Sequence, residues 1–275
     1  MKKLLLFLFV TIISTASYAQ KGHYFYATFG GGFHHFDYYP DDYFYQEVGE
    51  GFSWSPCKGY TFNLGWQYCV AKSFGFSAGV NFCNYGERWN INGSVKSEIH
   101  FNNYKEILRQ TDLEIPVGIF FQPSLGRSLR LLIGFNGYYS TMLTQKWKGT
   151  GSIVYQDNTL SNPSGDTQFN KSEFGIGSDL QFCIALNRYR TKELIIGAYA
   201  KYGLTAVKNK IDKQGFFDTQ TLEYKSITNI KVSGYECTNH HRCVGLLLGF
   251  RYYLDMRAIK QKKKNKAKTT DNPKL

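Results

Sequence analysis

The chain repeatedly alternates apolar and polar residues with a period of two, the period of a β-strand, in which successive side chains point to opposite faces. The clearest case runs from Tyr60 to Val70, where aromatic and aliphatic residues occupy the even positions and small or polar residues the odd ones. The recurrence of this pattern predicts an all-β protein with eight main strands. The predicted strands cover approximately residues 24–36, 58–71, 75–86, 109–122, 129–143, 172–187, 193–207 and 243–254.

The connections between these strands alternate in length. Short links fall near residues 72–74, 124–128 and 189–192, and the links near 37–57, 87–108, 144–171 and 208–242 are long. With the N-terminus in the periplasm, every short link lies on the periplasmic side, which is the habit of outer-membrane barrels. The sequence therefore predicts a transmembrane antiparallel up-and-down β-barrel with long extracellular loops.

Two alternatives accompany this prediction. A soluble β-sandwich shows the same alternation, so strand length, loop asymmetry and aromatic residues suited to membrane interfaces decide for the barrel. A ten-stranded barrel would use the weakly alternating segment 216–233, which we interpret instead as a hairpin outside the membrane. The candidate interfacial residues are Trp66, Tyr68, Tyr139, Tyr202, Tyr252 and Tyr253.

One face of the predicted strands is almost continuously apolar, whereas the other carries charges that cannot face lipid. An eight-stranded barrel has an interior just wide enough for side chains to fill it. We therefore expect the inward charges to form a packed network that closes the lumen, and we do not expect a porin. The expected lumen charge network consists of Asp112, Glu114, Arg130, Glu173, Asp179, Lys201 and Arg251.

The ends of the chain differ from the strand region. Residues 1–19 have the positive, apolar and small-residue regions of a secretory signal peptide, with cleavage expected between Ala19 and Gln20. Residues 20–255 form the predicted outer-membrane barrel, and residues 256–275 a basic, disordered periplasmic tail. Most of the net charge of +12 lies in these two ends, so the barrel is nearly neutral and nucleic acid is not an expected partner.

Candidate chemistry is sparse. The six cysteines match no metal-binding spacing, and Cys237 with Cys243 is the candidate disulfide, since both lie at the end of the longest loop on the oxidising side. The His34-His35 and His240-His241 pairs each offer at most one ligand to a shared site, because adjacent strand residues point to opposite faces. We interpret them as surface residues and expect no metal and no cofactor.

Enzymatic activity is not expected either. A lipid hydrolase would need a nucleophile and a base on the barrel wall, and Ser140 and Glu173 have no histidine on their own strands. Pro116, inside a predicted strand, indicates a bulge or bend, because proline cannot donate a ladder hydrogen bond.

Three features resemble a known family. They are the signal peptide ending at Ala19-Gln20, the strand Asp112–Gly118 with its Leu-Glu-Ile-Pro core, and the glycine-rich last strand from Gly245 to Leu254. Together they resemble the outer-membrane barrels of Gram-negative bacteria that include PorT-like and OmpA-like small barrels. The resemblance implies an eight-stranded barrel in the outer membrane, and PorT-like members are associated with protein secretion.

The expected function is that of a barrel with a plugged lumen, which acts through its loops or tail in secretion or as an envelope accessory. Its expected partners are outer-membrane lipid and envelope or secretion proteins. The alternative is a lipid-active or small-molecule-binding outer-membrane barrel.

Overall fold

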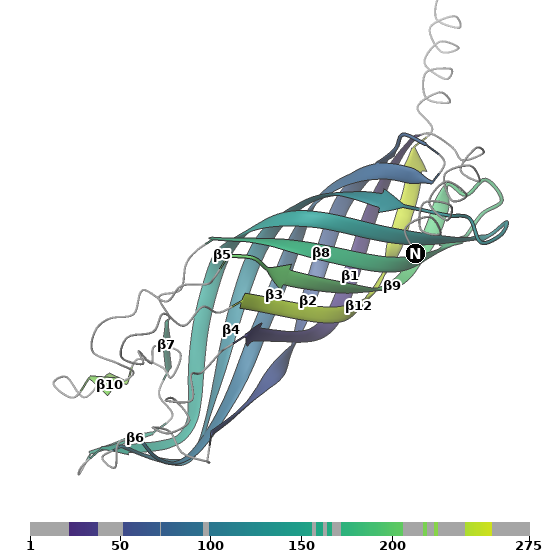
Figure 1. The fold of residues 1–275 in the computed structure, drawn as a ribbon. Coiled ribbons are helices and arrows are strands. Elements are labelled where there is room, and N and C mark those ends of the chain that lie inside the picture. The colour runs from purple at the N-terminus through teal and green to yellow at the C-terminus, as the bar shows by residue number, and fades with distance from the viewer. Residues whose placement is uncertain are drawn as a thin grey trace, which may run out of the picture.

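The chain forms a closed antiparallel barrel of eight strands, as the sequence predicts, because β4 pairs with β5 and the first strand β1 pairs with the last strand β12 (Figure 1). This computed structural model describes residues 22–37, 52–71, 73–95, 99–155, 158–161, 164–166, 172–205, 217–218, 223–224 and 240–254. The barrel strands are β1 (Gly22–Asp37), β2 (Phe52–Cys69), β3 (Phe74–Val95), β4 (Ile99–Phe121), β5 (Leu129–Tyr155), β8 (Ser172–Ala185), β9 (Lys192–Gly203) and β12 (His240–Leu254). Among the residues described, no helix is long and apolar enough to cross a membrane.

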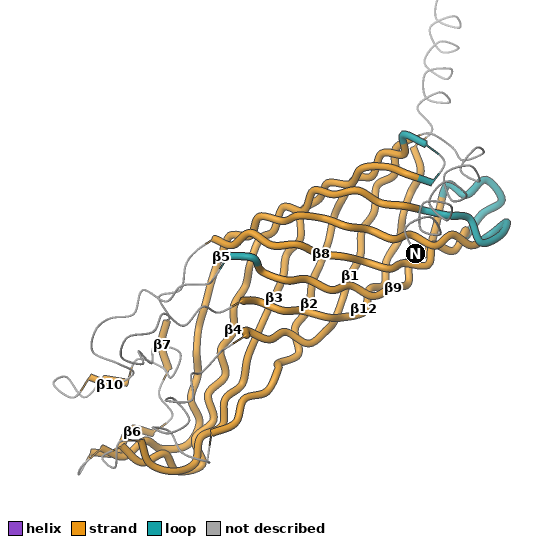
Figure 2. The backbone as a smooth tube through the Cα atoms, in the orientation of Figure 1, coloured by secondary structure: helices purple, strands orange, loops and turns teal. Residues whose placement is uncertain are grey.

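The strands β3, β4 and β5 are much longer than predicted, and β2 begins earlier, at Phe52. Residues 87–108 and 144–155, expected in loops, are largely strand, and the β3–β4 and β4–β5 ladders continue to the tip of a hairpin at Val95 and Ile99. Charged residues interrupt the alternation in these segments, which is why their strand character is hard to read. We call residues 86–95, 99–109 and 146–155 the extension. Figures 1 and 2 show its strands continuing past the ends of β8, β9 and β12.

Short strands add to the sheet at the same end of the barrel. β6 (Asn158–Ser161) and β7 (Ser164–Asp166) pair with the extended part of β5. β10 (Phe217–Asp218) and β11 (Glu223–Tyr224) pair only with each other. The described residues of the segment 216–233 therefore form a small pair of strands that is not part of the ring of eight.

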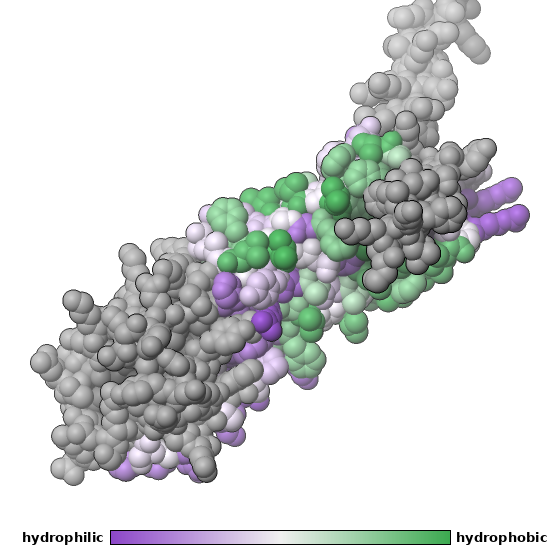
Figure 3. All heavy atoms as spheres, viewed as in Figure 1, coloured by the Kyte–Doolittle hydropathy of each residue, from purple (hydrophilic) through white to green (hydrophobic). Residues whose placement is uncertain are grey.

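The outside of the barrel carries an apolar belt. Val117 is 61% exposed and Phe29 58%, values that would be unusual for such side chains in water. From Phe25 to Phe33 the belt covers ~27 Å of strand at about 3.4 Å per residue, which is ~20 Å along the barrel normal at a tilt of about 40°. Figure 3 shows hydrophobic side chains gathered around the middle of the barrel. Belt residues include Phe25, Phe29, Phe33, Phe62, Leu64, Phe76, Val80, Ile115, Val117, Ile119, Phe135, Phe174, Ile176, Phe182, Ile196, Val244, Leu248 and Phe250.

A closed barrel with such a belt pairs every strand edge and presents a largely apolar surface to lipid. The protein is an outer-membrane β-barrel. Because outer-membrane barrels have short periplasmic turns and long extracellular loops, we assign the end with the short turns to the periplasm and the extension to the extracellular side.

The periplasmic turns are held together by specific bonds. In the β8–β9 turn the Asn187 side chain accepts a hydrogen bond from the Thr191 backbone N–H at 2.9 Å. Arg190, at a φ of 51°, reaches the neighbouring β4–β5 turn and donates to the Arg127 carbonyl at 2.6 Å. At the same end, the aromatic rings of Trp66, His23 and Tyr68 pack against one another. These aromatic residues occupy the interfacial level that the sequence suggested.

Two local features correct the predictions. Pro116 causes no bulge: its register with β5 is continuous, and only the pairing with β3 is interrupted, between Ala78 and Asn81, without a shift. The missing proline N–H accounts for this gap. Tyr253 is not interfacial but is buried inside the barrel, where its ring lies 4.9 Å from that of Tyr24.

Candidate functional site: the lumen charge clusters

All seven residues of the expected charge network point into the barrel. Glu114 is 0% exposed and Arg251 2%, while Asp179 and Lys201 are partly buried. They form no single network. The structure separates them into one cluster near the periplasmic end, one near the extracellular end, and Asp179 between them.

The arginine cluster closes the periplasmic half of the lumen. Glu193 of β9 lies between two cations, with 3.6 Å from its Oε1 to Arg130 Nε and 3.5 Å from its Oε2 to Arg251 Nη1. Sequence reasoning missed Glu193, although it shares the inward parity of Lys201 on the same strand. One carboxylate thus neutralises one of two guanidinium charges.

Neutral partners complete the arginine cluster. Arg130 donates to the Tyr24 hydroxyl at 2.8 Å, and Arg251 donates to Gln122 Oε1 at 2.8 Å. The Arg251 guanidinium also lies 3.7 Å from the centre of the Tyr24 ring. A cation on an aromatic face retains part of the stabilisation that it loses by leaving water. These contacts join strands β1, β5, β9 and β12 with Gln122, the residue that follows β4, across the lumen.

The lysine cluster lies in the extracellular half. Lys201 Nζ of β9 is 2.5 Å from Glu114 Oε2 of β4. The same carboxylate accepts hydrogen bonds from the Tyr85 hydroxyl and, at 3.1 Å, from Asn81 Nδ2. These donors replace the hydrogen bonds to water that the buried carboxylate has lost.

Further acids lie beside the lysine cluster. Asp112 accepts hydrogen bonds from Gln110, at 2.9 Å, and from the Ser140 hydroxyl, at 3.1 Å. Glu173 accepts one from the Tyr138 hydroxyl at 3.4 Å. The extracellular half of the lumen is therefore rich in carboxylates, whereas cations predominate in the periplasmic half.

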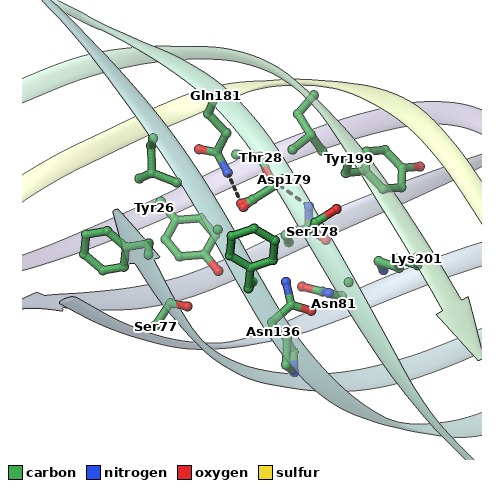
Figure 4. Close-up of a pocket in the computed structure, with 18 of the residues that line it drawn as sticks. Tyr26, Thr28, Ser77, Asn81, Asn136, Ser178, Asp179, Gln181, Tyr199 and Lys201 are labelled. Atoms are coloured by element: carbon green, nitrogen blue, oxygen red, sulfur yellow. Dashed lines mark hydrogen bonds between the residues drawn. The ribbon is translucent and has the colours of Figure 1, made fainter. Parts of the chain in front are cut away.

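Between the two clusters lies a cavity of about 70 Å³. Its lining is mostly polar, with Asp179, Asn81, Asn136 and Tyr26 around it (Figure 4). Asp179 accepts a hydrogen bond from Gln181 at 3.0 Å. A polar cavity of this volume has room for a few water molecules but not for a metabolite or an acyl chain.

The histidines are not surface residues, contrary to the sequence interpretation. His34 and His241 are both buried in the lumen, and their rings stack at 5.9 Å between centroids. Each pair does send only one ring inward, but the two inward rings come from neighbouring strands, β1 and β12. His241 Nδ1 lies 3.9 Å from Glu173 Oε2, so Glu173 does have a histidine neighbour, from another strand.

The cysteines contribute no cross-link in the described part of the chain. Cys243 is a free, buried thiol whose Sγ lies 3.6 Å from His34 Nε2. Cys237 lies outside the described residues, so the structure gives the Cys237–Cys243 pairing no support. Cys69 and Cys83 are free as well, and their register partners are Gly75 and Thr61. No group of three or more His, Cys, Asp or Glu side chains suited to a metal ion occurs among the residues described.

Comparison with known proteins finds solved structures of similar fold. No protein-family model matches the chain, and no curated protein matches it. The attachment invasion locus protein Ail of Yersinia pestis is 10% identical, with a TM-score of 0.34 over 85% of this chain and 100% of its own. The outer membrane protein OprG of Pseudomonas aeruginosa is 11% identical, with a TM-score of 0.41 over 86% of this chain and 98% of its own.

A third similar structure is a major outer membrane protein from Thermus thermophilus. It is 12% identical, with a TM-score of 0.41 over 85% of this chain and all of its own. Because these TM-scores lie below 0.5, the assignment of the fold rests on the strand pairing and the apolar belt of this chain itself.

Proposed function

We propose that this outer-membrane barrel is a closed, non-conducting scaffold that acts through contacts of its extracellular side and its basic tail, with envelope or secretion proteins as partners. The observation that carries the proposal is a contrast within one molecule. The lumen is crossed by charged side chains at two levels, while β3, β4 and β5 continue past the ends of β8, β9 and β12 as the extension.

The lumen favours closure over transport. The arginine cluster and the lysine cluster each join side chains from several strands, and the cavity between them holds about 70 Å³. Opening a path would require breaking buried ion pairs, which costs several kcal/mol.

The extension favours a role in contacts. Its strands extend those of the barrel and stay paired with one another, with local register shifts such as the one between Thr111 and Asp112. The PorT-like Asp112–Gly118 strand supports secretion proteins as the class of partner, and residues 256–275 supply a second candidate contact on the periplasmic side.

A planar-bilayer recording tests closure. We expect the folded full chain to give no steady conductance, and a Lys201→Ala/Glu114→Ala variant, which removes the lysine cluster, to give at most brief openings. Steady channels from the unmodified chain would disprove a closed lumen.

In-membrane crosslinking tests the contact role. The full chain is compared with a chain ending at Asp255 and with a chain in which Asn-Gly replaces residues 92–103, since Ile91 and Tyr104 are register partners. We expect a defined partner to be lost with the hairpin tip, the tail or both. If neither change affects capture, the contact is not made by these segments. If the full chain captures nothing, the scaffold proposal fails.

A second candidate is a lipid-active or small-molecule-binding barrel. It is supported by the buried Glu173–His241 contact beside Cys243 and His34, since a nucleophile, a base and an acid lie near one another. Hydrolysis of phospholipid vesicles by purified folded protein tests it, with Cys243→Ser and His241→Gln as variants. Background activity in the unmodified chain removes this candidate.

A further inference from the structure

The outer face of the extension is cationic. Across β3, β4 and β5, Gly86 pairs with Arg109 and Arg109 with Lys146, and in the next outward row Arg88 pairs with Ile107 and Ile107 with Lys148. Residues paired directly across a sheet share a face, so these side chains lie together. We call this surface the cationic face; it consists of the exposed residues Lys58, Arg88, Lys105, Arg109, Lys146 and Lys148.

Acids are absent from this surface in the part of the chain whose side chains are described. Glu87 and Glu106, on the extended parts of β3 and β4, are 1% exposed and point to the opposite, inner face. The register places Asp166 of β7 opposite Lys146, and its side chain is not described. Among the described residues no ion pair involves the cationic face, and its six side chains are exposed.

The cationic face begins directly above the apolar belt. On β4 the outward residues change from Ile115 and Leu113 to Thr111 and then to Arg109. The Thr111 hydroxyl is bonded to Asn84 at 3.1 Å, which forms a neutral polar row between belt and cations. At about 3.4 Å per residue and a tilt of about 40°, Arg109 lies ~10 Å above Leu113 along the barrel normal. Lysine and arginine side chains reach several ångströms further toward the membrane.

One cation is fixed in place. Arg109 lies across the small Gly86 and donates from Nη1 to the Lys58 carbonyl at 2.7 Å. A Cβ at Gly86 would come within 3.0 Å of Arg109 Nη1, so the glycine makes room for this position. This bond uses one N–H group of the exposed Arg109 side chain, and Lys146 is its direct neighbour on β5. Arginine and lysine side by side are a suitable pair for phosphate.

We infer that the cationic face binds the phosphate groups of an anionic glycolipid in the outer leaflet of the membrane. The position at headgroup level favours a lipid over a soluble polyanion, because the lipid phosphates lie where these side chains reach. Neighbouring strands about 4.8 Å apart and rows about 7 Å apart allow several cations to contact one phosphorylated headgroup.

The test titrates bis-phosphorylated lipid A into the detergent-solubilised full chain and reads the apparent Kd by native mass spectrometry. Each cation near an anionic lipid surface strengthens binding roughly fivefold. We expect Arg109→Gln/Lys146→Gln to weaken binding at least fivefold, and the further changes Arg88→Gln and Lys148→Gln to weaken it still more. Dephosphorylated lipid A is expected to bind at least tenfold more weakly to the unmodified chain.

The matched control is Arg127→Gln/Arg188→Gln, which removes the same charge from exposed positions in the periplasmic turns. It should leave the Kd within twofold. An equal loss in both variants, or no loss in either, overturns the inference. Inorganic polyphosphate is the soluble probe: if it binds with the same dependence on Arg109 and Lys146 while lipid A does not bind, the inference of a lipid is wrong. Circular-dichroism melting confirms that each variant is folded.

Discussion

The barrel wall and the extension are built from the same strands, yet their side chains are arranged in opposite ways. In the barrel, β4 turns Ile115 and Val117 outward and Glu114 inward. In the extension, the same strand turns Lys105 and Arg109 outward and buries Leu108. The backbone ladder passes through this inversion with only local irregularities.

The difference follows from the medium around each part. Lipid surrounds the barrel, so polar groups are stable only inside, where partners such as Lys201 and Glu114 satisfy one another. Water surrounds the extension, so Trp89, Trp147 and Ile91 are buried on its inner face, and the cations of the cationic face point outward. The level at which the pattern inverts therefore marks the outer boundary of the membrane.

The largest expected effect comes from breaking the polar interior of the barrel. Lys201→Met leaves Glu114 buried without its cation, and removing one partner of a buried pair costs about 3–5 kcal/mol. We expect a loss of that size in the free energy of unfolding, measured by denaturant titration in phospholipid vesicles. Lys201→Met/Glu114→Gln, which removes both charges, should recover part of it. A single variant as stable as the unmodified chain would show that the pair is not a structural element.

The next largest effect is expected from a charge placed on the outer surface of the barrel. Val117→Arg places a charge in the middle of the belt, which costs about 2–4 kcal/mol. Ile107→Glu places a charge on the outer face of the extension between Arg88 and Lys148, and should change the free energy of unfolding by less than about 0.5 kcal/mol. Similar costs at the two positions would mean that the belt does not end below the extension.

A smaller effect is expected from the packing of the interior. Tyr26 lies on Gly65, its direct partner across strands β1 and β2, and a Cβ at Gly65 would collide with the tyrosine ring. Gly65→Ala should therefore cost about 1–3 kcal/mol in the same titration. Gly137→Ala, at an outward position whose nearest atom would lie 3.9 Å away, is the matched control. Equal effects would indicate a general loss of chain flexibility and not a collision.

The smallest change is expected from thiol labelling. In a Cys237→Ser background, the buried thiols Cys69, Cys83 and Cys243 should not react with a membrane-impermeant maleimide while the barrel is folded. A cysteine introduced by Asn90→Cys, on the outer face of the extension, should react at once. Labelling of the unmodified thiols, read by intact mass, would show that the lumen admits the reagent.

The alternation of side chains was sufficient to predict the strand count, the belt and the inward position of residues such as Arg130 and Arg251. Extending the same parity would also have found Glu193, His34 and His241. Which charges pair with one another could not be predicted from the sequence, because the contact of Glu193 with both arginines depends on the stagger of strands around the closed ring. The extension was missed because Lys105, Glu106 and Arg109 disrupt the hydrophobic signal.

The pairing of β1 with β12, which closes the barrel, has a consequence for biogenesis. His23 pairs with Leu254, so the ring closes between the first and the last strand of the barrel. Until β12 is available, the edge of β1 has no partner, and an unpaired strand edge cannot remain in hydrocarbon. Contacts so distant in sequence also form slowly. Insertion and closure must therefore be coupled, and the whole strand region must be exported before the chain can enter the membrane as a stable barrel.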